Sequence, residues 1–381
     1  MRFAPPPSLR IADGSGGLNQ IRVRSYNERL IMSLLLQNNG MSRMQMGKIS
    51  GLSAQTISVI VRGLERDGLI SRGEAQSGRV GPPTIPMSLN PDGVFSVGIS
   101  LYRHGIDVVL IDFIGGVRHF SHLNYEHLVL DDVKSSLLSM IAEALDVLDA
   151  SVADRVAGIG VSIPADVQQW SEELARFDFE QFLQSETGYE IYIQNDVTAA
   201  AGAESMFGAA VSLDNYLFCF LGDGDDYRLV LDHQIHAGIA TSHQDRSSVG
   251  LTALQELCMQ HNQAVDTLLR RDGTWDNLEP SLQLWIKACA DRLCHSLLNL
   301  RQFVSIDQMI VTGLLPSEVS ARIVDEVCSI LSTKPGSDFE RIEVVQGEIG
   351  PKVSAVGAAR LPFQSRFVGH HVQSLANEQV I

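Results

Sequence analysis

The chain has 381 residues, of which 45% are hydrophobic, and a formal net charge of −16. This length and hydrophobic content suffice for two or three domains with cores of their own, which excludes a fibrous or disordered protein. No apolar run approaches the roughly 20 residues of a membrane span, and the first residues, MRFAPPPSLR, lack the apolar core of a signal peptide. The five cysteines form no C-x-x-C pair, which favours a reducing compartment. We therefore predict a cytoplasmic protein with no membrane partner.

Charge is distributed unevenly along the chain. Residues 1–90 carry 11 Lys and Arg against 5 Asp and Glu, a net charge of +6. The remaining residues carry 18 against 40, a net charge of −22. A small basic segment joined to a large acidic body is typical of a DNA-binding module attached to a ligand-binding domain.

The first part of the chain predicts a flexible arm followed by three helices. Residues 1–20 contain three consecutive prolines and a glycine cluster, which predict the arm. Ser25 and Ser53 are each suited to cap the helix that follows them, and Ser42 begins a second, short helix that runs to Ile49. Gly51 lies in the tight turn before the third helix. A helix, a turn with glycine and a second helix make up the helix-turn-helix motif, whose second helix enters the major groove of DNA.

Two extended segments complete this domain, one at residues 69–72 and one that ends at Leu89. They predict a winged helix-turn-helix domain over residues 21–90, with Arg79 at the tip of the wing. Short polar side chains at the start of the third helix can contact base edges and phosphates. The candidate DNA-binding residues are Ser42, Ser53, Ala54, Gln55, Thr56, Ser58, Arg62 and Arg79. The alternative is a helical bundle that serves as an interaction domain.

The body of the chain alternates apolar strands with helices. Buried strands are predicted at residues 95–101, 106–113, 156–164, 192–196 and 216–221. The first two form a predicted β-hairpin, and residues 128–148 predict a long amphipathic helix. The alternation predicts an α/β fold whose sheets are covered by helices.

Asn195 and Asp196 put an amide and a carboxylate at the carboxyl end of a strand, where open α/β sheets bind ligands. An alanine-rich helix follows directly. The alternative is therefore that one of the two residues is only the N-cap of this helix. The local pattern leaves both interpretations open.

Several motifs, in this order, resemble the transcriptional-repressor branch of the ROK family (repressors, open reading frames and sugar kinases). They are GISLYRHGIDVVLIDFIGG, GIGVSIP, IQNDVTAAAGAE, VLDHQIHAG, MIVTGLL and VGAA. The resemblance extends from about residue 22 to residue 362, and it implies the actin-like, ribonuclease-H-like fold of sugar kinases. Two α/β lobes, at residues 91–215 and 216–381, would enclose a sugar cleft. We expect the C-terminal segment to pack back on the first lobe.

The nucleotide-binding loops of the kinases are altered in this chain. Where the kinases carry D-x-G-G-T, residues 100–104 read SLYRH, without the carboxylate and without the glycines. Where the kinases carry G-T-G-x-G-x-G, residues 222–228 read GDGDDYR, and three aspartates would repel a polyphosphate. We therefore expect no enzymatic activity and no cofactor.

The resemblance also raises the question of whether this chain has the structural zinc site of its relatives. Relatives carry a His followed by a cysteine cluster that holds a structural zinc, but residues 236–246 contain no cysteine. The aspartate cluster at residues 223–226 is too short for a calcium loop and lacks its closing Glu. We expect no bound metal.

By resemblance, Asn195 and Asp196 match an Asn-Asp pair whose Asp is the general base in kinases and a hydroxyl ligand in repressors. His243 matches the His of a later sugar-binding motif whose Glu has no clear counterpart, and Gln194 stands where the family often has Glu. We therefore predict that Asn195, Asp196 and His243 bind the sugar. The alternative for His243 is an ordinary surface histidine.

These observations favour a sequence-specific transcriptional regulator of carbohydrate metabolism, and a repressor in particular. Its partners would be double-stranded operator DNA and a small carbohydrate effector in the cleft, and it would act as a homodimer or dimer of dimers. Two alternatives remain open. One is a ligand-independent DNA-binding regulator whose sugar cleft is vestigial, and the other is an active sugar kinase with an appended regulatory head.

Overall fold

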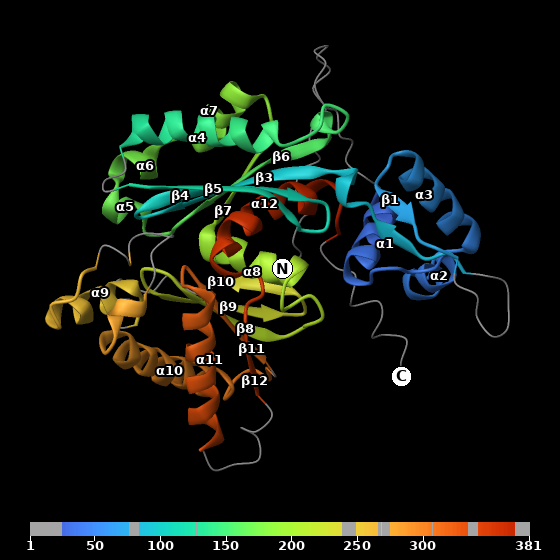
Figure 1. Ribbon diagram of the computed structural model, residues 1–381. Helices are drawn as coiled ribbons and strands as arrows, with labels where there is room; N and C mark the ends of the chain where they lie inside the picture. Colours follow the sequence, from blue (N-terminus) through green and yellow to red (C-terminus); the bar gives the residue numbers. More distant parts are fainter. Residues whose placement is uncertain are drawn as a thin grey trace, which may run out of the picture.

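The computed structural model describes residues 25–75, 84–125, 129–237, 249–265, 268, 275–306, 308–333 and 342–369. In chain order these residues form a small winged head, a first α/β lobe and a second α/β lobe (Figure 1). Within these ranges, none of the helices combines the length and the apolarity needed to cross a lipid bilayer.

The winged head consists of three helices and a two-stranded sheet. The helices are α1 Tyr26–Gln37, α2 Arg43–Ser50 and α3 Ala54–Arg66, and the strands are β1 Ile70–Arg72 and β2 Met87–Leu89. The caps predicted at Ser25 and Ser53 are confirmed, because each accepts a hydrogen bond from the backbone amide three residues further on. Ser42 caps α2 in the same way, one residue before the helix begins. Arg79, the predicted wing tip, lies outside the described residues.

The first lobe is built on a five-stranded sheet in the order β5-β4-β3-β6-β7. Its strands are β3 Phe95–Tyr102, β4 Gly105–Asp112, β5 Val117–Asn124, β6 Val156–Ile163 and β7 Ile191–Asn195. The first three pair antiparallel, and β6 and β7 continue the sheet parallel to β3. The helices are α4 Leu130–Asp146, α5 Val167–Trp170, α6 Glu172–Arg176, α7 Phe179–Thr187 and α8 Asp196–Phe207.

The edge strand β5 was not predicted from the sequence. Its residues, VRHFSHLN, are partly or fully exposed, because an edge strand has a neighbour on one side only. It therefore needs no apolar run, and its pattern does not differ from that of a polar loop.

The second lobe repeats the topology of the first. Its sheet has the order β10-β9-β8-β11-β12, with strands β8 Tyr216–Leu221, β9 Asp225–Leu231, β10 Gln234–Ala237, β11 Gln308–Gly313 and β12 Glu343–Gln346. Again the first three strands pair antiparallel and the last two run parallel to the first. The helices are α9 Leu251–Gln260, α10 Ser281–Leu300, α11 Ser317–Ser332 and α12 Val353–Arg366, with short 3₁₀ helices at Asp276–Leu278 and Gly350–Lys352. The first lobe has two such 3₁₀ helices, at Pro91–Gly93 and Ala153–Arg155.

The helices α8 and α12 follow the fifth strand of each sheet and pack against each other between the two sheets (Figure 1). On the outer faces, α4 covers the first sheet, and α10 and α11 cover the second. The strand β8 illustrates this layering, because Phe218 points into the central layer whereas Leu217 and Cys219 point toward α10 and α11. The C-terminal helix α12 thus packs on β3 and β6 of the first lobe.

Glycines allow the central layer to pack closely. A Cβ atom at Gly98 of β3 would come within 2.0 Å of the Ala355 carbonyl oxygen, and one at Gly160 of β6 would come within 1.8 Å of the Ala358 carbonyl oxygen. At Gly357 of α12, the same atom would lie 2.0 Å from a backbone oxygen of α8. These three glycines belong to the GISL, GIGV and VGAA motifs, so the motifs reflect close helix–sheet and helix–helix contact.

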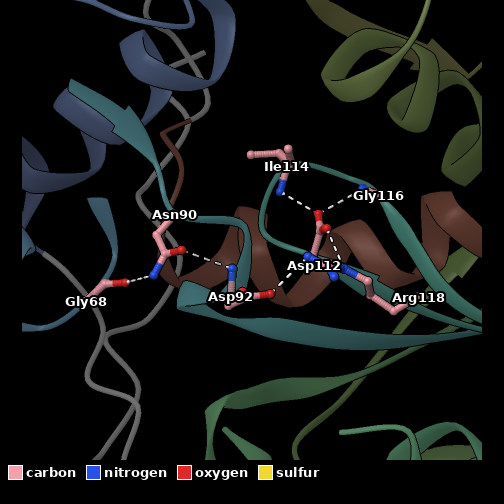
Figure 2. Close-up of polar contacts among 7 residues, drawn as sticks. All are labelled: Gly68, Asn90, Asp92, Asp112, Ile114, Gly116 and Arg118. Atoms are coloured by element: carbon pink, nitrogen blue, oxygen red, sulfur yellow. Dashed lines mark hydrogen bonds and ion pairs between the residues drawn. The ribbon is translucent and has the colours of Figure 1, made fainter. Parts of the chain in front are cut away.

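Polar contacts on both sides fix the segment that connects the head to the first lobe (Figure 2). Asn90, which follows β2, donates a hydrogen bond to the carbonyl oxygen of Gly68 in the head, at 2.7 Å. Arg118 of β5 pairs with Asp92 at 2.9 Å and with Asp112 at 2.8 Å. The head also shares one apolar cluster with the central layer, so head and body are packed together.

Candidate functional sites

The helix α3 presents one exposed side to solvent. We call this side the α3 stripe; it consists of Gln55, Val59, Arg62 and Arg66, which are spaced by three or four residues. Val59 is 64% exposed, whereas Ile57, Ile60, Val61 and Leu64 on the other side are buried. Val59 and Arg66 were not among the predicted residues, although the helical period opposite the buried face would have identified them.

The remaining predicted DNA-binding residues have structural roles as well. The hydroxyl groups of Ser53 and Thr56 are 2.8 Å apart, and Ser58 donates a hydrogen bond to the Ala54 carbonyl oxygen at 2.8 Å. Ser42 is buried and its hydroxyl group caps α2. In the described structure Ser42 therefore orients α2 and does not present a side chain to a partner, whereas Ala54 and Gln55 are exposed.

Glu65, near the C-terminal end of α3, contacts two arginines from neighbouring elements of the head. Glu65 forms an ion pair with Arg72 of β1, and its carboxylate lies 3.5 Å from Arg43 of α2. The hydrogen bond from Arg72 is the main cause that lowers the pKa of Glu65 below its ordinary value. These contacts fix α2 and β1 relative to α3, so the helix that carries the α3 stripe has a defined orientation within the head.

A pocket of about 170 Å³ lies between the two lobes, and we call it the interlobe pocket. The first lobe contributes the ends of β3, β6 and β7, and the second lobe contributes the turn after β8. Its polar lining includes Arg103, Asp166, Asn195, Asp196, Asp223 and Asp226. Four carboxylates and one guanidinium therefore face this pocket among the described residues.

Asn195 is both a helix cap and a pocket residue. Its Oδ1 accepts a hydrogen bond from the Thr198 amide at 3.1 Å, and its Nδ2 donates to Asp196 Oδ1 at 2.9 Å. Arg228 of β9 also donates to Asn195 Oδ1. The cap that the sequence offered as an alternative is thus present, in the same residue that lines the interlobe pocket.

Two carboxyl groups of the interlobe pocket, those of Asp196 and Asp223, retain protons more strongly than usual. Burial, with smaller contributions from Asp226 and Asp166, raises the pKa of Asp196 to about 7. Burial, followed by the charge of Asp166, raises the pKa of Asp223 to about 6. Asp196 is half-buried, and its accessible surface faces the interlobe pocket, so near neutral pH it can either donate or accept a proton.

The two altered kinase loops both reach the interlobe pocket, with one correction to the prediction. Tyr102 and Arg103 line the pocket from the turn after β3, and Asp223 and Asp226 line it from the turn after β8. Asp225 does not belong to this group, because it is buried and pairs with Arg292 at 3.1 Å.

The described residues contain no group of three His, Cys, Asp or Glu side chains that could hold a metal ion. The segment in which relatives carry their cysteine cluster falls largely on residues 238–248, which lie outside the described ranges. His243, the third predicted sugar ligand, is one of these residues.

Comparison with known proteins gives matches to both parts of the chain. Residues 24–71 match the family described as "Winged helix-turn-helix DNA-binding", and residues 96–245 match the "ROK family". The chain is 25% identical to the uncharacterized protein y4fQ of Sinorhizobium fredii, over 90% of this chain and 92% of that protein. It is 23% identical to the xylose repressor of Bacillus spizizenii over 58% of this chain and 59% of that protein's length.

Among solved structures, a ROK family transcriptional regulator described as a homolog of the E. coli MLC protein superposes with a TM-score of 0.63. It shares 18% sequence identity, and the match covers 92% of this chain and 98% of the other. A ROK family glucokinase from Streptomyces griseus superposes with a TM-score of 0.54 at 16% identity, over 70% of this chain and 98% of the other. The predicted fold class, a winged helix-turn-helix domain followed by a two-lobed sugar-kinase-like fold, is confirmed. The chain carries a ROK-family domain joined to an N-terminal winged helix-turn-helix DNA-binding domain.

Proposed function

We propose that this chain is a sequence-specific transcriptional regulator that binds operator DNA through its winged head and responds to a small neutral carbohydrate in the interlobe pocket. The observation that carries the proposal is the α3 stripe, displayed on the second helix of a helix-turn-helix pair. A repressing role agrees with the name of the xylose repressor, with which it shares sequence similarity.

The side chains of the α3 stripe suit the major groove of DNA. Arginine can donate two hydrogen bonds to guanine, glutamine can pair with adenine, and an apolar side chain can contact the thymine methyl group. Arg62 and Arg66 would also neutralise phosphates and release counterions, which makes binding sensitive to salt.

The interlobe pocket suits an uncharged polyol better than an anion. Carboxylates accept hydrogen bonds from sugar hydroxyl groups, whereas four of them near one site repel a phosphate or another carboxylate. Asp196 would accept from a hydroxyl group and Asn195 would bind beside it. His243 is proposed as a third ligand on the resemblance alone.

A sugar kinase is the second candidate, and the pKa of Asp196 favours it, because a general base works best when its pKa lies near the working pH. The same carboxylates that raise this pKa, Asp226 and Asp166, would however repel the phosphates of a nucleotide. We therefore propose that the chain has no kinase activity and binds no nucleotide cofactor. Turnover of ATP in the presence of pentoses, hexoses and amino sugars would overturn this.

The operator would be read by two heads at once. A homodimer or a dimer of dimers would place two α3 helices on the halves of a palindromic site, at a spacing fixed by the dimer. Binding to chromosomal DNA also requires that the protein act in the cytoplasm.

DNA binding is tested with the full chain and a duplex that carries its own upstream region, by fluorescence anisotropy at increasing salt. We expect tight binding that weakens steeply with salt and exceeds the binding of a shuffled duplex. Affinity that depends neither on salt nor on sequence would contradict the proposal.

Sugar binding is tested separately, by thermal denaturation. In a panel of neutral sugars, the effector should raise the melting temperature of the wild type but not of Asp196→Ala. If no sugar stabilises either protein, the cleft is vestigial and regulation is independent of a ligand.

A further inference from the structure

A second and larger pocket lies where the winged head meets both lobes, and we call it the junction pocket. It has a volume of about 450 Å³, within the usual range for small-molecule sites. Its walls come from α1, α8, the turn between β9 and β10, and α12 with the residues that follow it. The lining residues that matter below are Ser33, Gln37, Gln194, Gly202, Arg360 and Gln364.

One cationic side chain of the junction pocket is almost fully buried. Arg360 is only 5% exposed and its Nη1 donates to Gln364 Oε1, whereas its Nε has no hydrogen-bond partner among the described residues. Within the described residues, no carboxylate forms an ion pair with Arg360. Burial lowers the pKa of Arg360 to about 10, so its guanidinium group remains charged at neutral pH. Burying a cation without a counter-charge costs desolvation free energy and destabilises the fold, so we infer that the charge serves to bind an anion.

The guanidinium group of Arg360 is held in place by packing. A Cβ atom at Gly202 of α8 would come within 2.2 Å of Arg360 Nη2. The absence of a side chain at Gly202 therefore gives Arg360 its place between α8 and α12. A guanidinium group that lines a pocket and is held in place is suited to bind an oxyanion, because little of its conformational entropy remains to be lost.

The two pockets differ in charge. Four aspartates line the interlobe pocket, whereas the described lining of the junction pocket contains Arg360 and no Asp or Glu. In a chain with a net charge of −16, an anionic metabolite is repelled from the interlobe pocket and attracted to the junction pocket.

The junction pocket also adjoins the contact between the head and α12. Arg29 of α1 donates to the carbonyl oxygens of Gln364 at 2.8 Å and Val368 at 2.6 Å. The Gly369 amide donates to Ser33 Oγ at 2.9 Å. A molecule bound to Arg360 would thus lie beside the hydrogen bonds that hold α1 against the body.

We propose that the junction pocket is a second effector site, in which Arg360 binds the oxyanion of a small carboxylate or phosphate monoester that bridges the head and the body. Gln37 of α1 and Gln194 of β7 would bind the remaining polar groups of this ligand. Because the ligand would fix the head relative to the lobes, its binding would change the affinity for DNA. Only this last consequence depends on the function proposed above.

Calorimetry on the full chain tests the site. Gluconate and glucose 6-phosphate are the carboxylate and phosphate probes, inorganic phosphate is the minimal probe, and glucose is their uncharged counterpart. We expect gluconate or glucose 6-phosphate to bind without competition from glucose. The probe that binds identifies the anion class. If neither binds, the proposal is wrong.

Two variants locate the binding. Arg360→Met removes the cation, and Gln364→Glu places a carboxylate where Arg360 already donates a hydrogen bond. We expect both to weaken anion binding by about tenfold or more. Gln364→Glu should also raise the melting temperature of the free protein, because it balances a buried charge. If Gln364→Glu folds and binds the anion as tightly as the wild type, the site is elsewhere and the proposal fails.

The coupling is measured separately, by anisotropy with operator DNA in the presence and absence of the bound anion. We expect the anion to change the DNA affinity of the wild type and not that of Gln364→Glu. An unchanged affinity of the wild type would refute the coupling. Failure of the chain to bind DNA at all would refute the function proposed above but would leave the calorimetric result standing.

Discussion

Arg228 of β9 donates a hydrogen bond to Asn195 Oδ1, so a side chain of the second lobe is bound to the N-terminus of α8 in the first lobe. Arg228 also donates from Nε to Thr198 Oγ1 at 2.9 Å. Asn195 therefore caps a helix and anchors an interlobe contact at the same time. A sugar hydroxyl group that donates to Asn195 Oδ1 must share this oxygen with Arg228 or displace Arg228, which would link sugar binding to the relative position of the lobes.

Replacing Arg228 with Met should lower the free energy of unfolding by about 1–3 kcal/mol, because it removes charge-assisted hydrogen bonds between the lobes. Urea denaturation measures this change. The matched control is Arg176→Met, since Arg176 pairs with Glu172 at 3.1 Å on an exposed helix surface, where the two side chains are 77% and 68% exposed. The control should change stability by less than about 0.5 kcal/mol. Equal effects of the two substitutions would contradict the interlobe role.

Stability should fall as the pH rises from about 4 to about 7. The pKa of Asp196 is raised from 3.8 to about 7 and that of Asp223 from 3.8 to about 6, so the folded state binds more protons than the unfolded state in this window. The favourable contribution is complete below pH about 4 and is lost once the pH passes these raised values.

The variant Asp196→Asn removes one of these titrations and keeps the shape of the side chain. We expect it to exceed the wild type in free energy of unfolding at about pH 8, by roughly 2 kcal/mol, and to differ much less at about pH 5. Urea denaturation at both pH values measures the difference. A gap between the two proteins that stays constant with pH would show that ionisation of Asp196 does not destabilise the fold.

The helices of the head and the buried strands could be predicted from the sequence because their signals are local. Ser25 and Ser53 are N-caps in sequence and in structure. The edge strand β5 could not be predicted, because it lacks an apolar run. The sequence also could not tell which of Asp225 and Asp226 faces the pocket, because side chains alternate along a strand and the answer depends on where β9 begins.

Arg360 illustrates what the sequence could not reveal. It follows the VGAA motif and resembles an exposed helical arginine in its local pattern. Its burial results from the contact of α12 with α8, two helices that are far apart in the chain, and from the absence of a side chain at Gly202. The junction pocket likewise depends on the placement of the head, which no local pattern encodes.

The glycines of the central layer should be sensitive to the smallest substitution. Gly160→Ala would place a methyl group 1.8 Å from the Ala358 carbonyl oxygen, so β6 and α12 would have to separate. We expect a loss of about 2 kcal/mol or more in the free energy of unfolding. Gly63→Ala is the control, because nothing lies within 4 Å of that position in α3. It should leave stability unchanged or raise it by up to about 1 kcal/mol. Similar losses from both variants would contradict the close packing of β6 and α12.

The α3 stripe predicts two different effects on DNA binding. If Arg62 contacts a phosphate, Arg62→Ala should weaken binding to the operator and to the shuffled duplex alike. It should also reduce the slope of log K against log salt concentration by about one, because one counterion fewer is released. Val59→Ser should weaken the free energy of binding to the operator by roughly 1 kcal/mol and leave binding to the shuffled duplex unchanged, because an apolar contact to a thymine methyl group depends on the base sequence. Both side chains are exposed, so neither substitution should disturb the fold.

Anisotropy titrations at several salt concentrations distinguish these effects, with Arg176→Ala as a control for the loss of one positive charge far from the head. Arg176 lies in α6 of the first lobe and is exposed, as Arg62 is. The control should bind both duplexes as the wild type does. If Arg176→Ala weakened binding as much as Arg62→Ala, overall charge would account for the effect. If Val59→Ser left operator binding unchanged, the α3 stripe would not read sequence at that position.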